Sequence, residues 1–101
     1  IHVIAAVLSI FPEWQEWNRK NIVGYAEVYI KASMDILEKR DANNLYADAK
    51  AGNIKNVVGI DIPFPEPKHP DVIIENNIER SDFSIMLKEI LQLDTVNEAL
   101  K

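Results

Sequence analysis

Residues 40–61, which read RDANNLYADAKAGNIKNVVGID, space basic side chains through a mostly small and polar stretch. The stretch holds two glycines and no proline. It is too weakly apolar to form a core and too regularly patterned for a random linker. A segment that opens and closes over a binding site should bury few apolar groups, and this composition fits such a mobile segment.

Other reactive side chains lack the neighbours that their chemistry needs. His2 and His69 lie far apart in the sequence without nearby ligating residues, so a metal site is not indicated. Ser9 has no evident His–Asp partners for a hydrolase triad. Asp35 and Glu38 share a helix face, where solvated carboxylates are more common than an acid–base pair.

Two further motifs have ordinary structural explanations. Trp14 and Trp17 are three residues apart and fit packing or a subunit interface better than a site. The PxxP of residues 67–70 resembles ligands of SH3 domains, but a rigid connection to the following strand is the ordinary explanation and the favoured one. Neither motif identifies a ligand.

Composition limits the class of protein. The 101 residues predict one domain, 48% of them are hydrophobic, and the net charge of −5 argues against binding to nucleic acid or a membrane surface. The absence of cysteine excludes disulfides and thiolate metal sites. The first eleven residues are too short to span a bilayer and make a poor signal peptide. We expect a cytoplasmic protein.

Hydrophobic patterning predicts an α/β fold. The apolar run 3–8 predicts a strand buried on both faces, and residues 25–30 and 71–75 predict two more. Helices are expected after Pro12, from Ser33 to Arg40, over residues 45–51 before Gly52, and after Ser81. Residues 61–71 should be extended because of their prolines. Ligands should then lie near the carboxyl ends of the strands, at residues 9–12, 31–33 and 75–77.

Three stretches in this order resemble the adenylylsulfate kinase (APS kinase) family: EVYIKASMDILEKRD at 27–41, LYADAKAGNIKNVVGID at 45–61 and PFPEPKHPDVII at 63–74. The likeness covers nearly the whole chain. It implies a partial P-loop kinase-type parallel sheet flanked by helices, with residues 40–61 as the lid. The family moves the γ-phosphoryl of ATP to the 3′-hydroxyl of adenylyl sulfate, giving PAPS, with Mg²⁺ as cofactor.

The resemblance also implies site residues. Arg40 matches the arginine that opens the lid and lies beside ATP, and Lys55 is placed to meet a phosphate or sulfate. The remaining substrate-contact positions are Ile10, Phe11, Asn43, Asn56 and Val57. No catalytic residue or metal ligand is assigned within the chain. A homodimer is left open.

This chain departs from the family pattern in two ways. It reads SIFP where the family often has FISP, and NNLYADA where the family often has KGLYKKA. Val57 stands where the family often has an aromatic residue. Because these changes fall at substrate positions, the acceptor is adenylyl sulfate or a related phosphate acceptor. It also contains no GxxxxGK[ST] motif. We therefore expect residues 1–101 to form a single partial domain, a piece of a longer chain, that is inactive alone. A non-catalytic remnant or interaction module is the alternative.

Overall fold

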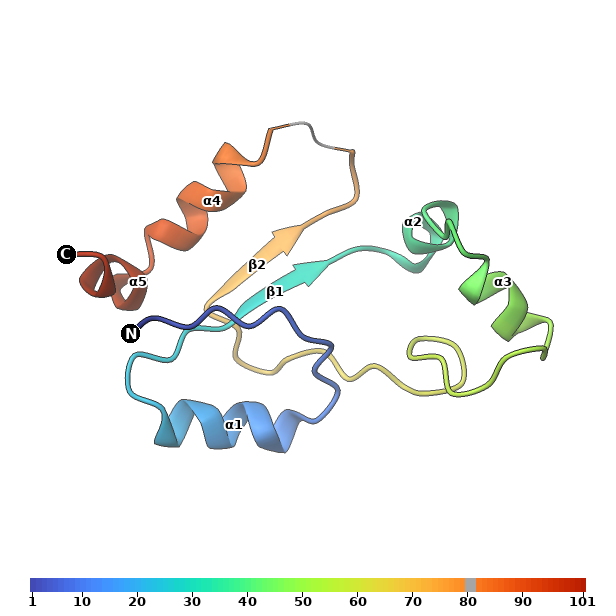
Figure 1. Ribbon diagram of the computed structural model, residues 1–101, viewed down its shortest axis with the longest axis horizontal. Coiled ribbons are helices and arrows are strands. Elements are labelled where there is room, and N and C mark those ends of the chain that lie inside the picture. The colour runs from blue at the N-terminus through green and yellow to red at the C-terminus, as the bar shows by residue number, and fades with distance from the viewer. Residues whose placement is uncertain (80–81) are drawn as a thin grey trace.

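The computed structural model describes residues 1–79 and 82–101. At its centre is a parallel sheet of two strands, β1 (Val28–Lys31) and β2 (Val72–Glu75), paired in register from Val28 with Val72 to Lys31 with Glu75 (Figure 1). The two strands are joined through a long connection that carries two helices, as parallel pairing requires. The expected α/β class with parallel strands is confirmed.

Local signals set the helices. Helix α1 (Pro12–Asn21) begins at a proline whose fixed φ suits a first turn, with Glu13 near its start and Arg19 and Lys20 in its last turn. Helix α2 (Met34–Lys39) has Ser33 at its N-cap position. Helix α3 (Leu45–Lys50) ends before Gly52, which has a φ of +82°. These three helices were predicted.

The C-terminal region differs from its prediction. It forms two helices, α4 (Ser84–Leu91) and α5 (Asp94–Ala99), instead of one. Phe83 holds the N-cap position of α4, and the predicted cap Ser81 lies outside the described residues. Helix α4 contacts β2 and α5.

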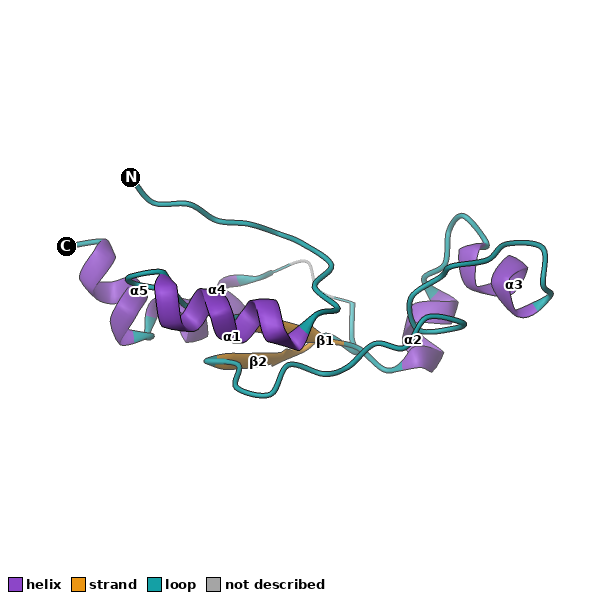
Figure 2. Cartoon of the chain, turned by 90° about the horizontal axis from the view of Figure 1, so that it is seen from below, coloured by secondary structure: helices purple, strands orange, loops and turns teal. Residues whose placement is uncertain are grey.

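The predicted first strand is wrong. Residues 3–8 run extended but pair with no strand in the described part of the chain, and Figure 2 shows the N-terminal segment standing away from the sheet. Val3, Ile4, Val7 and Leu8 are all largely exposed. A strand needs a neighbouring strand to satisfy its backbone, and an apolar run alone cannot supply one.

The buried core is correspondingly small. Among the described residues, its buried apolar side chains are Val57 and Ile74, exposed by 6% and 3%. The radius of gyration is 15.9 Å, against about 13 Å for a compact domain of this length. The chain is therefore open, with α2 and α3 extending away from the sheet at one end (Figure 1). No helix in the described residues is long and apolar enough to cross a bilayer.

Candidate functional site

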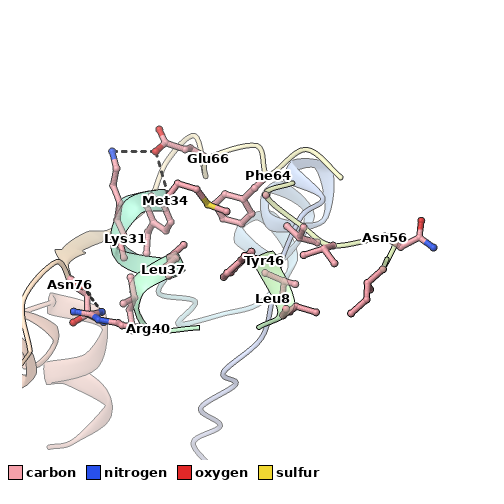
Figure 3. Close-up of a pocket in the computed structure, with 18 of the residues that line it drawn as sticks. Leu8, Lys31, Met34, Leu37, Arg40, Tyr46, Asn56, Phe64, Glu66 and Asn76 are labelled. Atoms are coloured by element: carbon pink, nitrogen blue, oxygen red, sulfur yellow. Dashed lines mark hydrogen bonds and ion pairs between the residues drawn. The ribbon is translucent and has the colours of Figure 1, made fainter. Parts of the chain in front are cut away.

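A cavity of about 760 Å³ lies at the carboxyl end of β1, between α2, the loop after α3 and the segment before β2 (Figure 3). Lys31 and Asn76, at or just after the ends of β1 and β2, both line it. This is the edge at which parallel sheets usually bind ligands. A larger hollow of about 1,230 Å³ lies between the N-terminal segment and α4 and α5, but no lysine or arginine of the described residues lines it. The smaller cavity is the better candidate site.

Four of the predicted site residues come together here. Arg40, Lys55, Asn56 and Val57 line the cavity. Ile10, Phe11 and Asn43 do not: Phe11 is at the N-cap position of α1, and Asn43 is exposed between α2 and α3. The structure also adds lining residues that the sequence did not assign, among them Tyr29, Lys31, Phe64 and Glu66.

Arg40 is positioned by the loop that follows β2. Its Nη1 donates a hydrogen bond of 2.8 Å to the carbonyl oxygen of Asn76. At the other end of α2, the backbone N–H of Ser33 donates to Oδ1 of Asn77 over 2.8 Å. Both ends of α2 are therefore attached to the residues just beyond β2, which holds the Arg40 guanidinium at the cavity (Figure 3).

Asp41 orders the start of α3. Its carboxylate accepts hydrogen bonds of 2.8 Å from the backbone N–H groups of Leu45 and Tyr46, two of the donors that a helix start leaves unsatisfied. An ion pair between Glu38 and Lys50 links α2 to α3. Residues 40–61 otherwise bury only Val57, so few buried apolar contacts hold this segment in place.

The loop that carries Asn56 and Val57 is organised by one carboxylate. Asp61 accepts hydrogen bonds of 2.6 Å from the backbone N–H of each of these residues. Those two hydrogen bonds lower the pKa of Asp61 below its ordinary value. Asn56 has a φ of +64°, a left-handed conformation that asparagine tolerates better than most residues. Gly59, with a φ of +95°, completes the turn.

The charges of the cavity oppose those of the chain. Its charged lining residues are three cations, Lys31, Arg40 and Lys55, and one anion, Glu66, in a chain whose net charge is −5. A hollow with an excess of positive charge attracts an anionic ligand. The Tyr29 and Phe64 rings, with centroids 6.0 Å apart, supply an apolar wall beside these charges.

The described residues give no fit for a magnesium centre of their own. They contain no group of three or more His, Cys, Asp or Glu side chains placed to hold a metal ion. Near the cavity, the Asp61 carboxylate is occupied by backbone donors, which leaves Glu66 as the one carboxylate among the described residues that line it. We assign no Mg²⁺ ligand among residues 1–79 and 82–101.

Several known proteins are similar to this chain in sequence. A family profile described as adenylylsulphate kinase matches residues 1–75. The adenylyl-sulfate kinase of Prochlorococcus marinus is 35% identical over 98 residues, which cover 93% of this chain and 49% of that protein. The adenylyl-sulfate kinase of Oceanobacillus iheyensis is 39% identical over 84 residues, which cover 81% of this chain and 42% of that protein.

A relative of different name is also similar. The cytidine diphosphoramidate kinase of Campylobacter jejuni is 41% identical over 75 residues, which cover 74% of this chain and 44% of that protein. The chain spans about half the length of the curated relatives it matches. The parallel α/β sheet is consistent with part of a P-loop kinase fold. On this evidence the chain belongs to the adenylylsulfate kinase family.

Proposed function

We propose that the protein is an ATP-dependent kinase that phosphorylates the 3′-hydroxyl of adenylyl sulfate to give PAPS. In this reaction the acceptor oxygen forms a bond to the γ-phosphorus, the bond from that phosphorus to the β-phosphate oxygen breaks to release ADP, and the hydroxyl proton passes to solvent. The observation that carries the proposal is the cationic cavity at the carboxyl ends of parallel strands in a chain of this family. We also propose that it acts in the cytoplasm.

Within this proposal, the lid 40–61 closes over the nucleotides and excludes water. Arg40 contacts ATP, while Lys55, Asn56 and Val57 contact the acceptor; these four residues already share a cavity. Ile10, Phe11 and Asn43 are proposed as acceptor contacts on the resemblance alone. Mg²⁺ would be held mainly by groups outside residues 1–101, and we propose that these residues are inactive by themselves.

A second acceptor has specific support. The relative from Campylobacter jejuni is named for cytidine diphosphoramidate, and this chain carries Asn43 and Val57 where the adenylylsulfate kinases usually carry lysine and an aromatic residue. The second candidate is therefore a kinase of the same fold whose acceptor is cytidine diphosphoramidate. A non-catalytic binding module remains the third, because no GxxxxGK[ST] occurs in the chain.

Substrate competition separates these candidates. The full-length protein is incubated with ATP, Mg²⁺ and either acceptor, and kcat/KM is measured for each from nucleotide products. A higher value for adenylyl sulfate supports the first candidate, and a higher value for cytidine diphosphoramidate supports the second. Failure to phosphorylate either acceptor would contradict both kinase proposals.

Limited proteolysis gives an independent measure. Trypsin cuts after Arg40, Lys50 and Lys55, all in the lid. The true acceptor, added with a non-hydrolysable ATP analogue, should slow cleavage at these sites, because a closed lid is less accessible. Cleavage after Lys68, an exposed lysine outside the lid, serves as the control.

A further inference from the structure

Lys31 is the last residue of β1, and it lines the cavity without a role assigned by the resemblance. Its Nζ lies 3.2 Å from Oε1 of Glu66, which lines the same cavity. Figure 3 shows this pair on one side of the cavity and Asn56 on the other. A lysine at the carboxyl end of a parallel strand is well placed to meet a ligand, and this one is already matched to an anion.

The partner of Lys31 is easily replaced. The two side chains keep 42% and 59% of their exposed surface, so water screens their attraction and the pair contributes little to stability. Glu66 lies in an irregular segment that is neither helix nor strand, which leaves its side chain free to turn away. A phosphate or sulfate carries up to two negative charges and several acceptor oxygens, so it competes well with a single carboxylate.

Displacing Glu66 would free a second donor. The Tyr29 hydroxyl donates a hydrogen bond of 3.4 Å to the same Oε1 of Glu66. Burial, followed by the charge of Glu66, raises the pKa of Tyr29, so its hydroxyl keeps its proton at neutral pH. Glu66 thus occupies a position at which a cation and a hydroxyl donor converge, a combination that also binds an oxyanion.

We propose that Lys31 binds a phosphate or sulfate group of a nucleotide in this cavity, and that Glu66 is the counter-ion which this group displaces. The nucleotide's identity rests on the proposed function, but the anion site itself does not. The cations Arg40 and Lys55 line the same cavity and would share the ligand's negative charge. Glu66 then acts as a competitor that keeps weakly charged ligands out.

The competing explanation is a purely structural ion pair that fastens the segment before β2 to β1. The two explanations predict opposite results when Glu66 is changed. If the pair is structural, removing either charge loosens the segment and weakens ligand binding. If Glu66 competes with the ligand, its removal strengthens binding while removal of the Lys31 charge weakens it.

The test uses isothermal titration of the full-length protein at low ionic strength with pyrophosphate, ATP and adenylyl sulfate, each alone. We expect Lys31→Met to raise Kd about tenfold for at least one probe, the loss typical of a charged hydrogen bond. Lys31→Arg should keep Kd within about threefold, and Glu66→Gln should lower it about threefold. Lys101→Met, which breaks an exposed ion pair with Glu98 far along the chain, is the matched control and should change nothing.

If Lys31→Met weakens the binding of ATP, the anion that Lys31 binds belongs to ATP. If it weakens the binding of adenylyl sulfate, the anion belongs to the acceptor. Three results would each overturn the proposal: no binding of any probe to the unmodified protein, equal Kd values for it and Lys31→Met, or weakened binding in Glu66→Gln. Turnover measured in the same preparations keeps the two proposals apart. Binding that depends on Lys31, in a protein that shows no turnover, would reject the kinase proposal and support the anion site. Turnover in a protein whose binding does not depend on Lys31 would support the kinase proposal and reject the anion site.

Discussion

Arg19 and Asp71 form a two-point ion pair across 52 residues of sequence, with 3.0 Å between Nη2 and Oδ2 and 3.3 Å between Nη1 and Oδ1. Arg19 lies in the last turn of α1, and Asp71 comes just before β2. The same carboxylate accepts a hydrogen bond of 2.7 Å from the backbone N–H of Glu27, just before β1. This pair therefore joins α1 to the start of both strands, at the opposite end of the sheet from the cavity.

Replacing Arg19 should loosen this junction. Arg19→Met removes the ion pair with Asp71, the hydrogen bond of 2.7 Å to the carbonyl oxygen of His69 and the stacking of the guanidinium over Tyr25. We expect the free energy of unfolding to fall by about 1–2 kcal/mol, because the charged hydrogen bonds are partly screened by solvent. Urea unfolding of the full-length protein measures the change. Lys20→Met, which removes the neighbouring cation on α1, should cost less; an equal loss would mean that Arg19 stabilises only through the helix end.

Asp71 should make the stability of the protein depend on pH in the acidic range. Partial burial raises the pKa of Asp71, but the hydrogen bonds from Arg19 and from the backbone of Glu27 outweigh it and set this pKa below the ordinary value. A carboxyl whose pKa is lower in the folded state stabilises the fold above its unfolded pKa of about 3.9, and loses this contribution as the pH falls through the folded pKa. Asp71→Asn should therefore lower the urea midpoint at pH 6 and leave a smaller difference from the unmodified protein near pH 3. A difference that stays constant over this range would contradict the assignment.

The Asp61 carboxylate should hold the loop that carries Asn56 and Val57 in its present conformation. Asp61→Ala removes the acceptor of the Asn56 and Val57 backbone N–H groups, so we expect their amide hydrogens to exchange about tenfold faster. The KM of the acceptor should rise by a similar factor with kcat less affected, because Asn56 and Val57 line the cavity. Asp61→Asn keeps one oxygen that can accept a hydrogen bond, so its exchange rates and its KM should lie between those of Asp61→Ala and the unmodified protein. Glu89→Ala on α4 is the control; unchanged exchange at Asn56 in Asp61→Ala would refute the prediction.

The elements that could be predicted from the sequence are those fixed locally. Pro12 and Gly52 predicted one boundary each of α1 and α3 because proline and glycine constrain the backbone at their own positions. The run at 3–8 was misassigned because a strand depends on partners distant in sequence, and none pairs with it in the described residues. The expectation for 71–75 succeeded because β1 is present to pair with β2.

Part of the cavity's lining could be predicted from the sequence, because it follows from the places at which the strands end. The rule that ligands bind beyond the carboxyl ends of strands led to residues 31–33 and 75–77, and Lys31 and Asn76 do line the cavity. The pairing of Lys31 with Glu66 could not be predicted, because Glu66 lies in an irregular segment whose path follows no periodic pattern. The carboxylates of Asp41 and Asp61, which bind backbone N–H groups, were missed because acidic residues in a loop usually face solvent.

Residues 1–101 expressed alone should expose apolar surface to solvent. Their accessible area is 7980 Å², whereas a compact protein of this mass exposes about 5,800 Å². Apolar side chains along the N-terminal segment contribute, with Ile4 and Val7 exposed by 98% and 74%. We expect this 101-residue chain to bind a hydrophobic dye or to self-associate, as measured by dye fluorescence and light scattering.

A double change tests the source of that surface. Ile4→Ser with Val7→Ser should reduce dye fluorescence by removing exposed apolar area, whereas Glu13→Gln and Glu16→Gln on α1 should leave it unchanged because they alter charge and not apolar area. If the chain of 101 residues is instead monomeric, silent to the dye and unfolds in one cooperative transition, it buries these residues in an arrangement other than the extended segment of Figure 2. In that case residues 1–101 would be a self-sufficient domain, and the proposal of a partial kinase domain would fail.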